Sequence, residues 1–220
     1  MSGVRWLLWS CLMAIPAAAL AQDEQFAGKR IVPVVQEPRH RVVYQIDDLY
    51  LLDVQIQPGD TTLPHTHDSA ILYTHLHGPT GPSSGRVISD TRYVQEPLTH
   101  EVSNEGPGLL HILALANYGE GRQSKRQPDG TLGAPVLQNP WFASYRIRLR
   151  AGEETGLVRL DNPSVVVQVH DGKIHVTRED GLVEEMNALG NWVWRDSSSP
   201  FVIRNLDDDA VEVVVNEARR

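Results

Sequence analysis

The chain has 220 residues, 41% of them hydrophobic and 22% charged, and a formal net charge of −8 at pH 7. These proportions are typical of a globular protein with one large or two small domains and a sizeable core. The acidic balance disfavours nucleic acid and anionic lipid, so we expect no nucleic-acid partner.

Residues 1–21 are typical of a secretory signal peptide. Arg5 precedes an apolar stretch over 6–20. Residues 19–21 form a small-x-small pattern that predicts cleavage before Gln22. Cleavage would remove Cys11, the only cysteine, and with it any thiol ligand or disulfide. The stretch is too short for a membrane span and no later segment is long enough, so we expect an exported protein, either periplasmic in a bacterium or secreted.

Alternating apolar and polar residues predict half-buried strands over 52–57, 146–150 and 211–216. Clusters of Gly, Pro, Asn and Asp mark turns between such segments. Only residues 182–189 have a pattern that could form a short helix. The fold class predicted from these features is all-β, of the barrel or jelly-roll kind.

Two histidine patterns predict a metal site. Gly59 is followed by His65 and His67, whose side chains share one face of a strand because they lie two residues apart. His100, followed by Asn104, would bring a third imidazole from a distant strand. Neutral imidazole is a preferred ligand of divalent transition metals, and three of them leave coordination positions open. The predicted ligands are His65, His67 and His100.

These patterns resemble the two motifs of the cupin superfamily. The first motif reads Gly-x5-His-x-His, then a Glu and a closing Gly, which is Gly78 here. The second reads approximately Pro-x-Gly-x2-His-x3-Asn, and Pro97 provides its proline. The glutamate position of the first motif falls on Ile71, so the chain departs from the family at that ligand. The resemblance implies a jelly-roll β-barrel whose metal site has three histidines without the carboxylate.

An internal repeat extends the resemblance to the whole chain. Residues 50–62 are similar to residues 143–155, and the similarity continues to the segment that holds Asn104 and its counterpart Asn205. Two tandem cupin barrels, a bicupin, explain this most simply. The expected boundaries are a signal peptide over 1–21, an N-terminal arm or edge strand over 22–37, a first barrel over 38–116, a linker over 117–140 and a second barrel over 141–220.

The second half lacks the histidines. Their repeat positions hold Val158, Leu160 and Phe201, all apolar. This predicts a degenerate second barrel with a dry core or an apolar pocket, and at most one metal per chain. Trp192 and Trp194, two residues apart, are expected to fill that second barrel.

Other polar residues have weaker roles in this interpretation. His111 lies on the strand after the second motif and is a candidate substitute ligand or proton shuttle, while Tyr73 is a candidate neighbour of the ligands. Asn104 is expected to tie a turn. His75 is expected to lie too far along its strand to be a ligand. Three further histidines match no pattern: His40, His170 and His175.

The resemblance leaves two classes of function open. One is a metal-dependent enzyme, a dioxygenase, isomerase or lyase, that acts on a small anionic organic molecule. Its metal cofactor would be Fe, Mn, Zn, Ni or Cu. The alternative is a non-catalytic module that binds a small molecule or the metal. A titratable group near the open metal positions, with His111 or Tyr73 as candidates, would favour the enzyme. Both a monomer and a homodimer are compatible with paired barrels.

Overall fold

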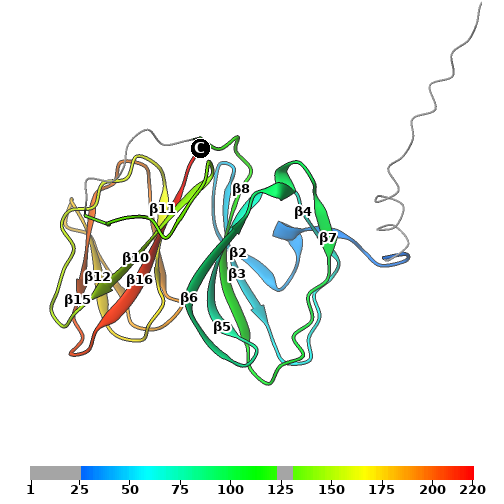
Figure 1. Cartoon of the computed structure of the whole chain (residues 1–220), viewed down its shortest axis with the longest axis horizontal. Helices are drawn as coiled ribbons and strands as arrows, with labels where there is room; N and C mark the ends of the chain where they lie inside the picture. Colours follow the sequence, from blue (N-terminus) through cyan, green and yellow to red (C-terminus); the bar gives the residue numbers. More distant parts are fainter. Residues whose placement is uncertain (1–25, 123–130) are drawn as a thin grey trace, which may run out of the picture.

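A computed structural model describes residues 26–122 and 131–220, which form two β-rich halves side by side (Figure 1). The predicted signal peptide, its cleavage site, the first residues of the arm and part of the linker lie outside the described residues. Helix is limited, within those residues, to the 3₁₀ turns η1 (Val34–Gln36) and η2 (Arg92–Val94). In the described chain no helix is long and apolar enough to cross a membrane. The all-β fold class predicted from the sequence is confirmed.

The first half contains a three-stranded and a five-stranded sheet, in the orders β1-β4-β7 and β2-β3-β8-β5-β6. Its strands are β1 (Val32–Pro33), β2 (His40–Ile46), β3 (Leu49–Ile56), β4 (His65–His67), β5 (Ala70–Gly78), β6 (Gly81–Asp90), β7 (Leu98–His100) and β8 (Leu110–Asn117). Within the expected arm, β1 pairs in parallel with β4, so the small sheet is completed by residues that precede both histidine patterns.

The second half repeats this design, with a five-stranded sheet β14-β11-β16-β10-β9 and a three-stranded sheet β13-β12-β15. Its strands are β9 (Leu137–Gln138), β10 (Phe142–Leu149), β11 (Ser164–Gln168), β12 (Ile174–Arg178), β13 (Val183–Met186), β14 (Trp192–Arg195), β15 (Phe201–Asn205) and β16 (Val211–Ala218). The strand β9 lies within the expected linker and pairs with β10.

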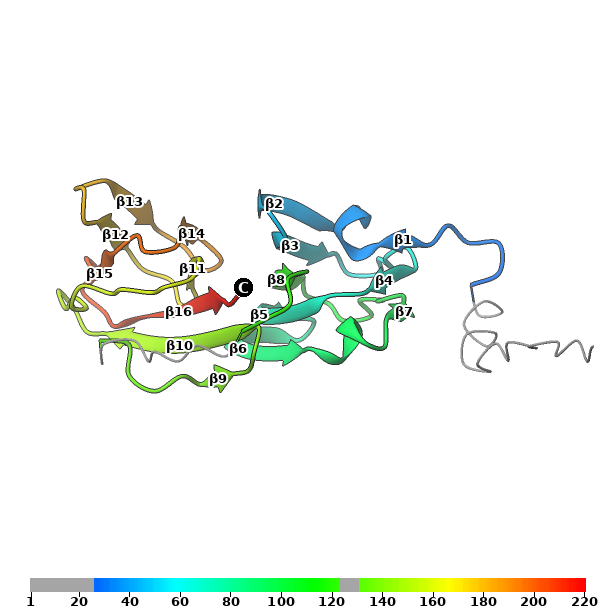
Figure 2. The same cartoon turned by 90° about the horizontal axis from the view of Figure 1, so that it is seen from above.

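The two large sheets pack face to face, as the view from above shows (Figure 2). One continuous buried cluster joins them, because strand alternation turns one set of apolar residues toward the other half. At its centre the Asn216 amide donates to Thr74 Oγ1 at 2.9 Å and accepts from Ser144 Oγ at 2.7 Å. The halves therefore share a core and satisfy its polar groups internally.

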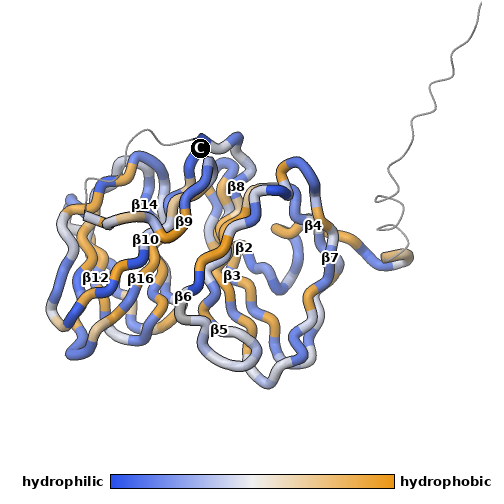
Figure 3. The backbone as a smooth tube through the Cα atoms, in the orientation of Figure 1, coloured by the Kyte–Doolittle hydropathy of each residue, from blue (hydrophilic) through white to orange (hydrophobic). Residues whose placement is uncertain are grey.

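Each half also has its own interior. The alternate residues of the same strands line it, and hydrophobic and hydrophilic segments alternate along the strands of both halves (Figure 3). The first interior has a small apolar cluster: Val34, Leu52, Val54, Ile56, Ile71, Ala114 and Ala116. The second interior is larger and includes Val158, Leu160 and Phe201, so the three histidine positions are filled there by packed apolar side chains.

The internal repeat predicted from the sequence appears in the backbone. Gly59 and Gly152 both have positive φ, of 81° and 69°, which glycine adopts without strain. Residue His65 lies opposite His100 in the β4–β7 pair, and Val158 forms the equivalent bridge with Phe201. The two halves thus share one architecture, which persists where the histidines are replaced.

Asn104 and Asn205 tie equivalent turns. The Asn104 amide donates to the carbonyls of Ile56 and Gly108, both at 2.8 Å, and accepts from the Gly106 amide. Asn205 makes the corresponding set of bonds in the second half. The structural role expected for Asn104 therefore agrees with its contacts.

Two expectations from the sequence were wrong. Residues 182–189 contain a strand, β13, paired with β12, because tertiary pairing overrides the weak helical pattern. Trp192 and Trp194 do not fill the second interior. The residue between them, Val193, faces it, so both indoles turn to the first half, with ring centroids 6.3 and 4.7 Å from that of Tyr44.

We predict that Asn104→Ala lowers the free energy of unfolding by about 2–4 kcal/mol, because it leaves two backbone carbonyls without their donor in a site where the side chain is 1% exposed. Urea unfolding followed by circular dichroism would measure this. The exposed Asn187→Ala is the control and should change stability by less than about 0.5 kcal/mol. Equal effects of the two substitutions would contradict the role assigned to Asn104.

Candidate metal centre

The three predicted histidines converge because two short strands pair in register. The strand β4 has only three residues, and its first and last, His65 and His67, turn to the same buried side. It pairs antiparallel with β7, where His100 lies opposite His65. One nitrogen from each ring lies within 4.8 Å of one nitrogen of both others. The structure therefore brings together all three residues that the sequence predicts as ligands.

The spacing of these rings fits a transition metal. His67 Nε2 and His100 Nε2 are 3.1 Å apart, and the three ring centroids are separated by 4.6 to 5.1 Å. With metal–nitrogen bonds of about 2.0–2.1 Å, neighbouring ligand nitrogens lie about 3.0 Å apart in octahedral and about 3.4 Å apart in tetrahedral geometry. The 3.1 Å between His67 Nε2 and His100 Nε2 falls within that interval, and the His65 nitrogen lies within 4.8 Å of both.

Hydrogen bonding orients His65 toward the same point. Its Nδ1 lies 2.9 Å from the carbonyl oxygen of Leu63, which can only accept, so Nδ1 carries the proton. The lone pair is then on Nε2, which is buried and has no hydrogen-bond partner among the described residues. A buried acceptor without a partner is costly, and a cation would satisfy it.

The electrostatic setting keeps the imidazoles neutral. Burial, and then the neighbouring histidines, lowers the pKa of His65 to about 4 and that of His67 to about 3. The pKa of His100 is also lowered, by burial and by His40. Neutral rings are the form that binds a metal, so the site is prepared for a cation at ordinary pH.

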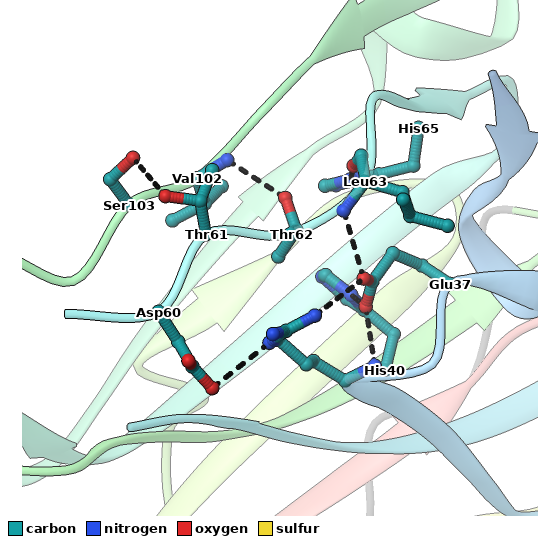
Figure 4. A network of polar contacts seen from close by, with 10 residues as sticks. Glu37, His40, Asp60, Thr61, Thr62, Leu63, His65, Val102 and Ser103 are labelled. Atoms are coloured by element: carbon teal, nitrogen blue, oxygen red, sulfur yellow. Dashed lines mark hydrogen bonds and ion pairs between the residues drawn. The ribbon is translucent and has the colours of Figure 1, made fainter. Parts of the chain in front are cut away.

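Sequence reasoning missed two residues next to the cluster, Glu37 and His40, which Figure 4 shows near His65. The ring of His40 packs against that of His65, with centroids 4.5 Å apart, and is 6% exposed. Glu37, 2% exposed, accepts a hydrogen bond from His40 Nδ1 at 2.6 Å. Neither residue belongs to a motif, because both precede the first pattern, and only tertiary packing brings them to the site.

Glu37 also holds the loop that leads to the histidines. Its carboxylate accepts from the backbone amides of Leu63 at 3.1 Å and Arg39 at 2.6 Å. Burial alone would raise the pKa of Glu37, but the hydrogen bonds from His40 and these amides outweigh burial and lower it. A buried carboxylate is thus present beside the site, although the motif position for it is occupied by Ile71.

Comparison with known proteins depends on structure alone. No family model matches the sequence, and no curated protein matches it. Among solved structures, AerE from Microcystis aeruginosa aligns with a TM-score of 0.58 at 12% identity, over 80% of this chain and 90% of its own. A cupin 2 conserved barrel domain protein from Leptotrichia buccalis aligns with a TM-score of 0.52 at 12% identity, over 81% of this chain and 88% of its own.

A salicylate 1,2-dioxygenase from Pseudaminobacter salicylatoxidans aligns with a TM-score of 0.53 at 12% identity, over 77% of this chain and 71% of its own. These alignments span both halves, and they include a protein described as a cupin. The chain has the cupin fold. The resemblance inferred from the two motifs is confirmed at this level, and the paired barrels extend it to a bicupin arrangement.

The first cupin barrel contains a cavity of about 340 Å³ next to the histidines. His40, His67 and His100 contribute to its wall, and so do Tyr73 and His75 from β5. Tyr73 therefore lies where the sequence placed it, inside the barrel and near the ligands, with its ring centroid 6.4 Å from that of His67. His75 shares the cavity but is not part of the three-histidine cluster.

Tyr73 interacts with a second tyrosine and an acid. Burial, then the charge of nearby groups and a hydrogen bond to Tyr93, raises the pKa of Tyr73 far above its ordinary value. Burial and the adjacent Asp90 raise the pKa of Tyr93 as well, and hydrogen bonds, first from Arg92 and then from Tyr93, lower the pKa of Asp90. Both phenols stay protonated at ordinary pH, with Tyr73 donating its hydrogen to Tyr93 and Tyr93 donating its own to Asp90.

His111 is not brought to the site. It alternates on β8 with Leu110 and Ile112, which line the cavity, so its own ring turns to the opposite face of the sheet. There His111 Nε2 bonds Asp53 Oδ1 at 2.9 Å. His111 therefore lies away from the three histidines, in contrast to the expectation that it substitutes for a ligand or shuttles protons.

We predict that Glu37→Gln lowers the free energy of unfolding by about 1–3 kcal/mol at pH 7, because an amide cannot accept from all of the donors around the carboxylate. The pKa of Glu37 is depressed in the folded chain, so its charge stabilises the fold above its ordinary value of 4.5, and this contribution is lost as the pH falls through the lower folded value. The difference between wild type and variant should therefore shrink in acid.

Urea unfolding at pH 7, 5 and 3.5 would measure this change. The control is Glu179→Gln, whose side chain is 60% exposed and which should differ little from wild type at any pH. A Glu37→Gln difference that stays constant across the series would show that the carboxylate charge contributes nothing.

Proposed function

We propose that this chain binds one divalent transition metal through His65, His67 and His100. The metal would bind a small organic molecule in the adjoining cavity. The observation that supports this most directly is the buried Nε2 of His65, which has no hydrogen-bond partner among the described residues and shares a cluster with two further imidazoles. Fe, Mn, Zn, Ni and Cu all accept such ligands. In keeping with the signal-like residues 1–21, the function belongs in the periplasm or outside the cell.

The leading role is that of a metal-dependent enzyme of the dioxygenase, isomerase or lyase class, acting on a small molecule with an anionic group. A bound divalent metal would polarise that group as a Lewis acid or, if iron, support redox chemistry. The residues of the chain would do the rest. The three histidines bring no charge, so they leave the full attraction of the cation for an anionic oxygen, and the apolar wall excludes water.

A non-catalytic binding module is the second candidate, and Tyr73 favours it. The high pKa of Tyr73 keeps its hydroxyl protonated, so this residue donates hydrogen bonds and does not serve as a general base. His111 lies on the other face of the sheet, bonded to Asp53, which disfavours it as a base as well. Binding without turnover requires only the metal and the hydrogen bonds.

We predict one transition metal per mature wild-type chain, purified without chelator, and loss of that metal in the His65→Ala/His67→Ala double variant. Elemental analysis by mass spectrometry and metal titration would measure it. One site is expected because packed Val158, Leu160 and Phe201 occupy the equivalent positions of the second half. The control is His175→Ala, which replaces a partly exposed histidine of the second half and should retain the metal.

A reproducible stoichiometry of two would contradict the assignment of the second barrel. Absence of metal, with no binding of Fe, Mn, Zn, Ni or Cu on titration, would overturn the proposed metal function.

We also predict that metal affinity depends little on pH between 7.5 and 6. Protons compete with a metal only when the pH is near or below the pKa of its ligands. Burial lowers the pKa of His65 to about 4 and that of His67 to about 3, and it lowers the pKa of His100 as well. Three histidines with an ordinary pKa near 6.5 would lose roughly 50-fold in affinity over this range. Zinc affinity measured by competition with a chromophoric chelator should change by less than about threefold, and a change of tens of fold would contradict the prediction.

A further inference from the structure

The chain has one extra residue just before β4. Thr61 lies opposite Ser103, and His65 lies opposite His100. From 61 to 65 the first segment advances four residues, whereas from 103 to 100 the second goes back only three. One residue between Thr61 and His65 is therefore unmatched, which makes a β-bulge. A bulge bends its strand and changes the direction of the side chains next to it, here the imidazole of His65.

The same offset occurs in the second half. Glu154 lies opposite Arg204 and Val158 lies opposite Phe201, again four residues against three (154 to 158 and 204 to 201). Because the bulge is present where no histidine follows it, the fold forms it independently of the metal site. The first half differs in having a histidine directly after the bulge. The direction of His65 then depends on the contacts that hold the bulge in place.

Leu63, inside the bulge, connects His65 to Glu37. Its carbonyl accepts a hydrogen bond from His65 Nδ1 at 2.9 Å, which leaves Nε2 of that ring to bind a metal. Its amide donates to Glu37 Oε1 at 3.1 Å. The next residue is Pro64, which has no amide hydrogen, so Leu63 has the only backbone donor between Thr62 and His65. The hydrogen bond to Glu37 therefore holds the residue that orients His65.

Glu37 is itself fixed in place. Its side chain is completely buried, and Oε2 accepts from the Arg39 amide and from His40 Nδ1, both at 2.6 Å. The ring of His40 packs against that of His65, with centroids 4.5 Å apart. The carboxylate thus acts on His65 by two routes, through the backbone of Leu63 and through the ring of His40 (Figure 4). Glu37 is not part of the metal-binding cluster, so neither route needs contact with the metal.

We propose that Glu37 is a positioning residue of the metal centre, whose carboxylate holds the bulge before β4 and thereby fixes the direction of His65 in the absence of metal. The inference rests on the proposed metal function and adds a residue that this function needs besides the ligands. Neither cupin motif contains it, because Glu37 precedes Gly59, the first residue of both. The first motif has Ile71 at its glutamate position, and the carboxylate of Glu37 serves the site in a different way.

The test compares Glu37→Gln with wild type, both as the full mature chain. Glutamine keeps the size of the side chain but has one acceptor oxygen, so its NH₂ group must face a donor, either the Leu63 amide or those of Arg39 and His40. We expect the zinc affinity, measured by competition with a chromophoric chelator, to fall about tenfold, as is typical for groups that orient metal-bound histidines. The absorption bands of the Co(II)-loaded variant should also shift, because the His65 nitrogen moves.

The matched control is Asp60→Asn. Asp60 lies in the same loop and its carboxylate also bonds Arg39, at 3.2 Å, but its side chain is 43% exposed. This substitution removes the same charge close to the site, and it should change zinc affinity by less than about twofold and leave the Co(II) bands in place. Unchanged affinity and bands in Glu37→Gln would overturn the proposal. Equal losses in the two variants would do so as well, because the effect would then come from charge in the loop and not from the hydrogen bond to Leu63.

A measurement on wild type decides the case in which Glu37→Gln does not fold. In the metal-free chain, the Leu63 amide should exchange its hydrogen with solvent at least about 100-fold more slowly than in an unstructured peptide of the same sequence, as followed by NMR. Exchange at the rate of the peptide would show that Glu37 does not hold the bulge and would overturn the proposal. Failure of wild type to bind zinc would instead show that the proposed metal centre is wrong, and this inference with it.

Discussion

The antiparallel pairing of β4 with β7 is the constraint on which the candidate site depends. Two strands of three residues each, with His65 opposite His100, bring residues more than thirty positions apart into one cluster. The parallel strand β1 and the carboxylate of Glu37 hold the other side of β4 and the loop before it. Without this register the imidazoles would point to different sides of the sheet, since a shift of one residue reverses every side chain.

The second half has the same backbone arrangement at this position, with different side chains. Val158 and Phe201 form the bridge that corresponds to His65 and His100, and the turn asparagine makes the same hydrogen bonds. An apolar cluster satisfies this position without any polar group, so the fold does not require histidines there. Three imidazoles with depressed pKa values, two of them buried and one half-buried, are costly to a fold, and such groups gather at functional sites.

The sequence predicted what depends on local spacing. The all-β class, the cupin fold and the convergence of His65 and His67 follow from strand alternation and motif order. It did not predict what depends on packing between distant segments. Glu37 and His40 precede the motifs and reach the site through the pairing of β1 with β4 and of β2 with β3. His111 and the tryptophans were misassigned because the face to which a side chain turns depends on strand register, which spacing alone does not give.

The position of Glu37 changes where the functional unit begins. A chain trimmed to the segment between the first and the second motif would keep all three imidazoles, and by motif inspection it would look complete. It would nevertheless lack the buried carboxylate and the strand that braces β4. The segment of chain that this site needs is therefore longer than its two motifs. A substitution in the residues before the barrel can alter the chemistry of the centre while every motif residue stays the same.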